Sequence, residues 1–375
     1  MSASLVGVVG RARPVVSPWW TVPLGIAFVS RLFSLAWLLL GITIAPAHHQ
    51  PGNGLIVLDA WWYTEIAETG YHAQGMLEGG FGMYHDFAFF PGWPALIAML
   101  TRVLPLETGL VALLAANALF CVGAVLVYRF ARPRFGERSA NWGLALLAFS
   151  PAGYVFSMAY AESLFLVVAA LALATPIASR SRAGLAALAQ IIRLPGFAIS
   201  ATALVTLRTQ PRRSLLVLIS APLVFAAWWL FIAYLTGDPL GYMQGTPSWW
   251  RIMGAPTGLL SWQPLAQDAI ARSDWDDLGS PIAVICLLAI LVGAGVVMLL
   301  QRERRDLGIY CLTLIAPTLL LAHWEHWPRH SVLAFPAFML LADRLRQTPR
   351  LLLLVAFAAL QAVFVIQVTH LMMTP

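Results

Sequence analysis

The chain has 375 residues, of which 60% are hydrophobic and only 11% are charged, and its mean hydropathy is +0.77. This composition lies far outside that of soluble globular proteins and indicates a membrane protein. A formal net charge of +6 could suggest a nucleic-acid partner, but the placement of the charges along the chain indicates membrane topology and no nucleic acid.

Apolar stretches long enough for a helix to cross a bilayer recur along the whole sequence. They are continuous rather than alternating, which favours helices over a β-barrel. Spans are expected near residues 22–45, 107–130, 140–157, 163–179, 214–236, 280–300, 307–322, 332–345 and 350–372. With two interrupted segments, they predict an all-α polytopic membrane protein of about 11 spans, forming a single domain over residues 1–375.

The first interrupted segment, residues 87–105, is apolar enough to cross the membrane. A full crossing would place Arg129 to Arg138 on the exterior side, against the preference of arginine for the cytoplasm. We therefore expect a hairpin, re-entrant or interfacial helix that is entered at Pro91 and Pro94.

The second interrupted segment, residues 183–208, has arginine clusters at both ends. At about 1.5 Å per residue it is too short for two full crossings. We expect two short half-helices that meet within the membrane at Arg193-Leu-Pro-Gly196, because irregular backbone is tolerated at that depth where it lines a polar cavity.

The basic residues predict the orientation. All 23 are arginine, and seventeen lie in short segments that alternate with the apolar runs, whereas the opposite segments hold all eight histidines and 13 of the 17 acids. The positive-inside rule places the arginine segments and the N-terminus in the cytoplasm. The chain is thus expected to be a multi-pass protein of the plasma (inner) membrane, with residues 46–105 (an outside loop plus the re-entrant segment) and 237–279 towards the exterior or periplasm. The seventeen are Arg11, Arg13, Arg129, Arg132, Arg134, Arg138, Arg180, Arg182, Arg208, Arg212, Arg213, Arg302, Arg304, Arg305, Arg344, Arg346 and Arg350.

The first outside loop contains the strongest catalytic candidate, Asp59. It follows Leu55-Ile-Val-Leu58, where the loop would turn back towards the bilayer. As a general base, this carboxylate could take a proton from an acceptor hydroxyl while a sugar leaves a phosphate. Transfer with inversion needs one such base rather than a pair of carboxylates. The alternative is a helix N-cap before Ala60.

Further polar and aromatic residues of the same loop are candidates for substrate binding: Trp62, Tyr63, His85 and Asp86. His85 and Asp86 adjoin the apolar re-entrant segment and could hydrogen-bond a sugar; the alternative is a solvated loop. A divalent metal on Asp59, Asp86 and His85 is conceivable, but their spacing matches no recognised ligand pattern, so no metal or other cofactor is expected.

Charged residues at membrane depth are costly and mark functional sites. Arg31 lies within the first span, Glu162 at a helix turn and Arg193 at the predicted break. Glu162 and Arg193 are candidates for donor binding, or they simply pair and hold helices together. Arg329 and His330 lie in a late outside loop, where the guanidinium could bind a lipid phosphate and stabilise it as a leaving group.

The second outside loop adds Arg251, in Trp249-Trp-Arg251, as a candidate for donor binding. Its tryptophans are typical either of anchors at the membrane interface or of platforms that stack on sugar rings. The sequence leaves both interpretations open.

Several of these motifs together resemble the GPI mannosyltransferase II (PIG-V type) family of the GT-C glycosyltransferase superfamily. The resemblance covers roughly residues 22–345, and its motifs occur in the family's order. They are Asp59-Ala with an aromatic pair, Ile66-Ala67, Gly70-Tyr71, Phe87-Ala-Phe-Phe-Pro-Gly-Trp-Pro94, Tyr160-Ala-Glu-Ser-Leu-Phe165, Arg193-x-x-Gly196, Thr236-Gly-Asp-Pro239, and Arg329 with Phe335-Pro336.

The resemblance implies a GT-C fold with its active site on the non-cytoplasmic face, a polyprenyl-phosphate-mannose donor, and Asp59 as the catalytic base. His330 is a departure, because bacterial relatives often carry an aromatic residue after the arginine. The expected function is an inverting mannosyltransferase that acts on a lipid-linked or envelope glycan acceptor. The alternative is a transporter or flippase of lipid-linked sugars, which also has many spans and broken helices. Against it, the polar candidates gather on one face and no second half of the chain matches the first.

Overall fold

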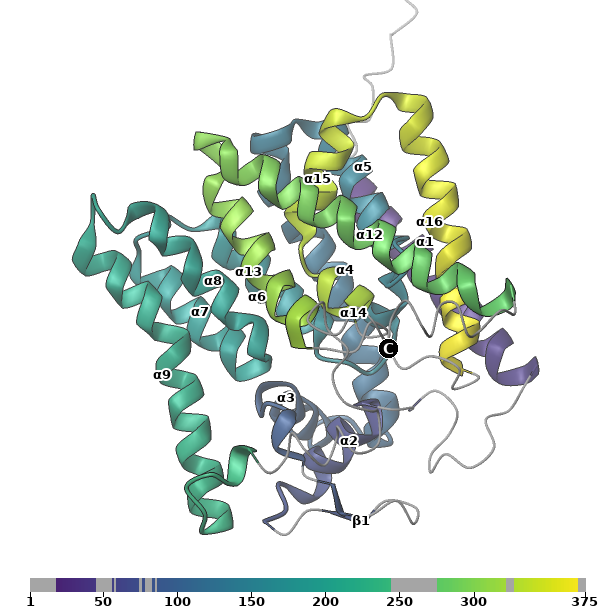
Figure 1. Ribbon diagram of the computed structural model, residues 1–375. Helices are drawn as coiled ribbons and strands as arrows, with labels where there is room; N and C mark the ends of the chain where they lie inside the picture. Colours follow the sequence, from purple (N-terminus) through teal and green to yellow (C-terminus); the bar gives the residue numbers. More distant parts are fainter. Residues whose placement is uncertain are drawn as a thin grey trace, which may run out of the picture.

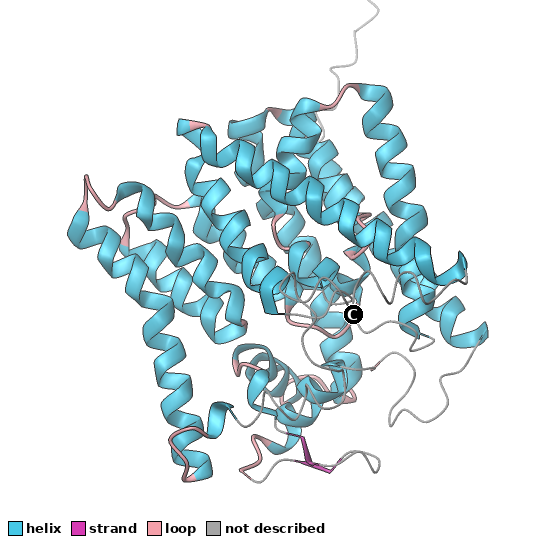
Figure 2. Ribbon diagram, in the orientation of Figure 1, coloured by secondary structure: helices cyan, strands magenta, loops and turns pink. Residues whose placement is uncertain are grey.

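The computed structural model describes residues 18–44, 56, 59–73, 76–77, 83–84, 86–243, 275–321 and 327–369. Within these residues the fold is a bundle of helices with one short antiparallel hairpin, in which β1 (Met76–Leu77) pairs with β2 (Met83–Tyr84) (Figures 1 and 2). The all-α polytopic architecture predicted from the apolar runs is confirmed.

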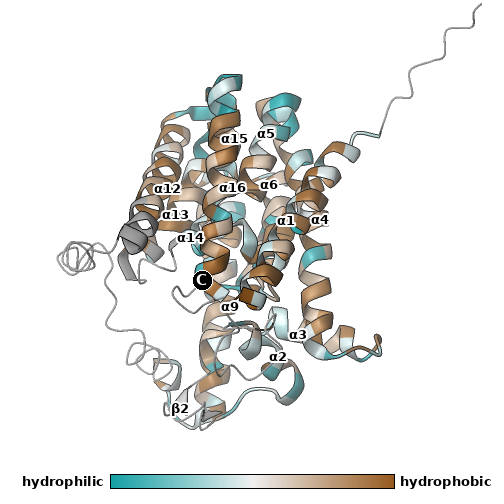
Figure 3. Ribbon diagram, turned by 90° about the vertical axis from the view of Figure 1, so that its right-hand side faces the viewer, coloured by the Kyte–Doolittle hydropathy of each residue, from teal (hydrophilic) through white to brown (hydrophobic). Residues whose placement is uncertain are grey.

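Five of the described helices are long and apolar enough to cross a membrane. They are α1 (Thr21–Ile44), α4 (Thr108–Phe135), α9 (Pro211–Thr236), α12 (Trp275–Leu300) and α16 (Gln347–Thr369). Shorter helices pack among them, namely α5 (Glu137–Ala148), α6 (Glu162–Ala174), α13 (Arg305–Leu321) and α15 (Phe335–Arg344). Figure 3 shows apolar residues along the helix shafts and hydrophilic residues near the ends of α5 and α15.

Helix α4 lies at the centre of the bundle and packs against α1, α5 and α6. Its buried face contains small residues, such as Ala116, Gly123 and Ala124, that allow neighbouring helices to approach closely. A Cβ atom at Gly123 would lie 3.2 Å from the Leu166 side chain of α6. The close approach of the two helices at Gly123 places α6, whose first residue is Glu162, against the centre of the fold.

Helix α5 is shorter than the span predicted over 140–157. It ends at Ala148, and a turn of 3₁₀ helix, η2 (Gly153–Ser157), replaces its last part. Pro151 explains the difference, because it lacks an N–H and disfavours helical backbone at the residue before it.

The buried Arg31 of α1 holds η2 in place. Its Nη1 donates to the Gly153 carbonyl (3.0 Å) and to Ser157 Oγ (2.8 Å), and its Nη2 donates to the Ala148 carbonyl (3.2 Å). The guanidinium also lies over the Phe120 ring, 4.1 Å from its centroid. Arg31 therefore binds backbone carbonyls at the end of α5 and at the start of η2, and it orients the turn that leads to Glu162.

Three of the predicted arginine segments meet at one end of the bundle, the upper end in Figure 1. Arg304, in η6 (Arg302–Arg304), donates to Asp343 Oδ2 (3.2 Å) and to the Arg134 carbonyl (3.0 Å). Arg138 donates to Gln347 Oε1 (2.6 Å). The α4–α5, α12–α13 and α15–α16 junctions are thus joined at the same end.

The segment 183–208 is a broken hairpin, as predicted. Helix α7 (Arg180–Ile192) stops at η3 (Leu194–Gly196), and the chain returns through α8 (Phe197–Ala201) and η4 (Thr202–Thr206). Arg182 Nη1 donates to Thr202 Oγ1 (3.0 Å), which joins the two arms. A side chain at Gly196 would place a Cβ 2.4 Å from the backbone nitrogen of Gln190. Only glycine permits so close a return.

The segment 87–105 forms η1 (Asp86–Ala88) and then α3 (Gly92–Thr101), a helix of 10 residues. Ten residues are too few to cross a bilayer, which agrees with the predicted re-entrant or interfacial helix. The indole Nε1 of Trp93 on α3 donates to the Ala159 carbonyl (3.0 Å), just before α6 begins.

Substituting Gly196 by alanine is expected to destabilise the hairpin by about 1–3 kcal/mol, because the new methyl group overlaps a backbone that cannot move aside. The thermal unfolding midpoint of the purified protein in detergent measures the change. Gly184→Ala on α7 is the matched control: nothing lies within 4 Å of its Cβ position, so it should be neutral or stabilise by up to about 1 kcal/mol. Equal unfolding midpoints for the two variants would contradict the conclusion that only glycine fits at position 196, where the chain folds back against Gln190.

Candidate functional site

Helix α2 (Asp59–Thr69) begins with the predicted base. The Asp59 carboxylate accepts a hydrogen bond from Arg329 Nη1, and its side chain is 30% exposed. Among the described residues its hydrogen-bond partner is this guanidinium and not a backbone N–H of α2, so the geometry favours a role in the site over the N-cap interpretation.

Glu162 is the first residue of α6 and is fully buried. Arg31 and Trp93 fix the preceding turn, which explains how a carboxylate can be held at this depth. Its position at the helix N-terminus is favourable for a negative charge. Burial of an ionised carboxylate nevertheless requires cationic partners.

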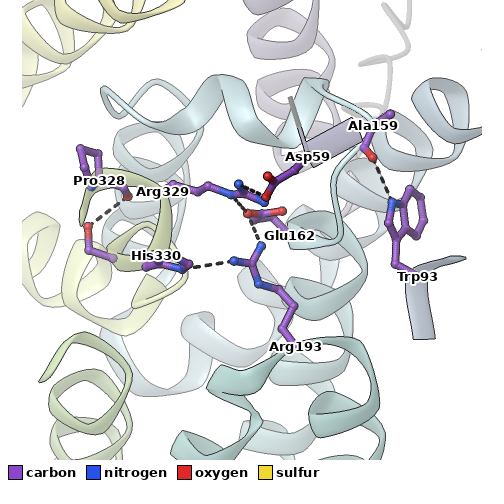
Figure 4. A network of polar contacts seen from close by, with 9 residues as sticks. Asp59, Trp93, Ala159, Glu162, Arg193, Pro328, Arg329 and His330 are labelled. Atoms are coloured by element: carbon purple, nitrogen blue, oxygen red, sulfur yellow. Dashed lines mark hydrogen bonds and ion pairs between the residues drawn. The ribbon is translucent and has the colours of Figure 1, made fainter. Parts of the chain in front are cut away.

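Two arginines from distant segments supply these partners (Figure 4). Arg329, in α14 (Trp327–Ser331), donates through Nε to Glu162 Oε1. Arg193, between α7 and η3, forms an ion pair with the same oxygen through Nη1. The Arg193 Nη2 atom also lies 3.1 Å from His330 Nδ1. We call Asp59, Glu162, Arg193, Arg329 and His330 the ion cluster.

Two tyrosines lie next to the ion cluster. The Arg329 guanidinium carbon lies 4.3 Å from the ring centroid of Tyr160. Tyr63 on α2 is buried close to Arg193, Glu162 and Arg329. Burial raises the pKa of the Tyr63 phenol, and the positive charge of Arg193 opposes the shift. The Tyr63 hydroxyl is therefore neutral at physiological pH.

Tyr160 was not among the candidates taken from the sequence. The available signal was its place two residues before Glu162, in the motif Tyr160-Ala-Glu-Ser-Leu-Phe165. A tyrosine ring against a guanidinium stabilises the cation and restricts its orientation.

The charges of the cluster are matched but unequally accessible. Two carboxylates face two guanidiniums, yet Glu162 is completely buried, Arg329 and Arg193 are nearly so, and Asp59 is partly exposed. A molecule approaching from solvent therefore meets Asp59 as the accessible carboxylate. The arrangement can accept a proton at Asp59 and present positive charge directly behind it.

Other predicted site residues lie outside the ion cluster. Trp62 is buried and stacks on Phe89, with centroids 5.7 Å apart, which is a packing contact. Asp86 is buried and accepts from the backbone N–H of His72 (3.0 Å), while the His72 Nδ1 lies 3.2 Å from the same oxygen. Burial raises the pKa of the Asp86 carboxyl, and the hydrogen bonds from His72 oppose this shift. His85 and Arg251 lie outside the described residues.

The metal alternative required Asp59, Asp86 and His85 together. In the described part of the chain, no three His, Cys, Asp or Glu side chains gather as a metal site would require. Asp59 is engaged by Arg329 and Asp86 by His72. Both aspartates of that set therefore contact other side chains, and the expectation that no metal is needed stays a prediction.

No protein-family model matches the chain, and no curated protein sequence matches it. Its fold is similar to the crystal structure of ArnT from Cupriavidus metallidurans bound to undecaprenyl phosphate, with a TM-score of 0.52 and 16% sequence identity over 88% of this chain and 60% of ArnT. The apo state of ArnT gives a TM-score of 0.50 at 16% identity, over 88% of this chain and 62% of ArnT. A complex of the Archaeoglobus fulgidus oligosaccharyltransferase with zinc and sulfate gives a TM-score of 0.49 at 12% identity, over 92% of this chain and 53% of the oligosaccharyltransferase.

The chain therefore shares the fold of ArnT and spans about three fifths of its length. The GT-C-like fold expected from the sequence is confirmed, and membership of the superfamily stays a prediction. At this identity the similarity does not distinguish the GPI mannosyltransferase II family from other GT-C families.

Proposed function

We propose that the chain is an inverting membrane glycosyltransferase that transfers mannose from a polyprenyl-phosphate-mannose donor to a lipid-linked or envelope glycan acceptor. The observation that carries the proposal is the ion cluster, in which the partly exposed Asp59 contacts the guanidinium of Arg329. The shared fold with a protein that binds undecaprenyl phosphate supports a lipid-phosphate donor. The family motifs around Asp59 support mannose as the sugar.

The chemistry requires one base and a cationic site for the leaving group. Asp59 removes the proton of the acceptor hydroxyl. At the same time, the hydroxyl oxygen bonds to the anomeric carbon of the sugar, from the face opposite the phosphate. The bond from that carbon to the phosphate oxygen breaks, and the electron pair leaves with the polyprenyl phosphate. Arg329 and Arg193 stabilise the negative charge that develops on this oxygen. Asp59 then returns its proton to solvent.

The remaining cluster residues position these groups. The Nδ1 of His330 accepts a hydrogen bond from Arg193, which restrains the orientation of the guanidinium. The neutral hydroxyl of Tyr63 is suited to bind a sugar hydroxyl or a phosphate oxygen. No step requires a metal ion or another cofactor.

The reaction is proposed to occur at the non-cytoplasmic face. Helix α6 separates the ion cluster from the arginine-rich end: Glu162 begins α6, whereas Arg134 and Arg182 contact the carbonyl of Leu173 near its end. The 13 residues of α6 correspond to a rise of about 20 Å. Because the arginine-rich end is expected in the cytoplasm, the cluster lies towards the exterior.

Purified protein in detergent, given polyprenyl-phosphate-mannose and extracted membrane lipids, is expected to form a mannosylated lipid or glycan. Thin-layer chromatography with labelled mannose measures the product, and a parallel reaction with another polyprenyl-phosphate sugar tests the preference for mannose. Mannose transfer that continues in the presence of a chelator would agree with a reaction that needs no metal.

The outcome also separates transfer from transport. Movement of the sugar lipid across protein-containing vesicles, with no glycosidic product in any acceptor mixture, would contradict the proposed function and favour a flippase. Loss of all transfer on chelation would show that a metal takes part. It would contradict the proposal that arginine side chains alone stabilise the leaving phosphate.

A further inference from the structure

Glu162 occupies an unusual position, because one of its oxygens serves both arginines of the site. Oε1 accepts from Arg329 Nε and forms the ion pair with Arg193 Nη1. Figure 4 shows the carboxylate between the two guanidiniums, with Asp59 at another nitrogen of Arg329. Glu162 begins α6, Arg193 follows the end of α7, and Arg329 lies in the short helix α14.

Two guanidiniums brought together in a nearly dry environment repel one another strongly. Arginine also has a long, flexible side chain, which must lose rotamer freedom to keep one orientation. A shared carboxylate oxygen counters both effects. It neutralises charge between the guanidiniums, and it restrains Arg329 by a charge-assisted hydrogen bond and Arg193 by an ion pair.

The two carboxylates bound by Arg329 are not equivalent. Asp59 is 30% exposed, whereas Glu162 is fully buried and is held by the turn that Arg31 and Trp93 fix. Asp59 has side-chain surface that a substrate can contact, whereas Glu162 has none and lies against the two guanidiniums. This difference assigns the two acids different tasks.

We propose that Glu162 is a positioning residue that holds Arg193 and Arg329 together as one phosphate-binding clamp, and that it contacts neither sugar nor acceptor. The inference rests on the proposed function and narrows the role expected for Glu162 from donor binding to alignment of the two guanidiniums. Its consequence is specific: loss of the Glu162 charge should impair recognition of the lipid phosphate and not of the lipid chain.

Equilibrium binding of undecaprenyl phosphate and of undecaprenol to the purified full-length protein tests this role. The wild-type protein is expected to prefer the phosphate by about 10- to 100-fold, the range that charge-assisted hydrogen bonds to one group provide. Glu162→Gln should lose most of this preference while its affinity for undecaprenol stays unchanged. Glu162→Asp keeps the charge but is too short to serve both arginines, so it should retain an intermediate preference.

Asp343→Asn is the matched control, because it removes a carboxylate from an ion pair with Arg304 at the other end of the bundle. This variant should keep the wild-type preference. If Glu162→Gln does not fold, the comparison of Glu162→Asp with the wild-type protein carries the test.

The outcomes separate the two proposals. A wild-type protein without preference for the phosphate contradicts the proposed function itself. A wild-type preference that survives in Glu162→Gln, or in Glu162→Asp where that variant carries the test, overturns the positioning role alone. Equal losses for phosphate and alcohol in the tested Glu162 variant would indicate a general structural role and also overturn it.

Discussion

Replacing Asp59 by asparagine is expected to reduce the turnover of sugar transfer by about 100- to 10,000-fold, the contribution typical of a positioned general base. Asparagine has nearly the same shape and keeps an oxygen that can accept from Arg329, but it cannot remove a proton from the acceptor hydroxyl. Binding of the lipid phosphate should persist, since the guanidiniums remain. Steady-state kinetics with labelled donor, together with equilibrium binding of undecaprenyl phosphate, measure the two effects separately.

Glu65→Gln provides the matched control for this substitution. Glu65 also lies on α2 and carries a half-buried carboxylate, but it belongs neither to the ion cluster nor to the family motif. Its substitution should leave turnover within a factor of about two, as for a surface change away from the chemistry. Transfer by Asp59→Asn at the wild-type rate would refute the assignment of the base.

The sequence predicted the helices better than it predicted the site. Continuous apolar runs identify membrane-crossing helices because burial in lipid leaves few other backbone solutions. The break at residues 193–196 was also predictable, since Pro195 and Gly196 interrupt a segment whose two ends carry like charge. The early end of α5 was not predictable in the same way. The apolar residues that follow Pro151 continue the hydrophobic run, so the sequence predicted one uninterrupted span.

The composition of the ion cluster was predictable in part. Asp59, Glu162, Arg193 and Arg329 each stood out as a charge in an apolar context, but no spacing in the sequence shows that they meet, since up to 270 residues separate them. A position close to Asp59 in the sequence predicted membership of the ion cluster less well than a charge in an apolar context did. Asp86 shares its loop, yet the structure pairs it with His72.

The ion cluster depends on residues that carry no chemistry themselves. Arg31 binds the carbonyls around η2, and Trp93 binds the carbonyl of Ala159. Both contacts fix the turn before Glu162, and Glu162 in turn fixes the two arginines. A buried polar network of this kind specifies one arrangement because each member would be costly to leave without its partner.

Arg329→Gln is expected to combine a large loss of transfer with a large loss of stability. The Arg329 side chain is 5% exposed and binds both Glu162 and Asp59, so its removal leaves a buried carboxylate with one cation fewer. Breaking such a buried pair destabilises a protein by about 3–5 kcal/mol. Arg329→Lys keeps the charge and should recover part of the stability, but a single ammonium cannot reproduce the two-armed contact, so transfer should remain impaired. Thermal unfolding and labelled-donor kinetics in the same detergent measure both quantities.

Arg304→Gln and Arg304→Lys are the matched controls at the opposite end of the bundle. Arg304 and Asp343 are 21% and 29% exposed, and solvent screens their attraction, so each variant should cost less than about 1 kcal/mol and leave transfer unchanged. The comparison also distinguishes the two roles of Arg329. A stable Arg329→Lys protein with wild-type turnover would mean that charge alone suffices, and that the fixed geometry between Asp59 and Glu162 has no part in stabilising the leaving phosphate.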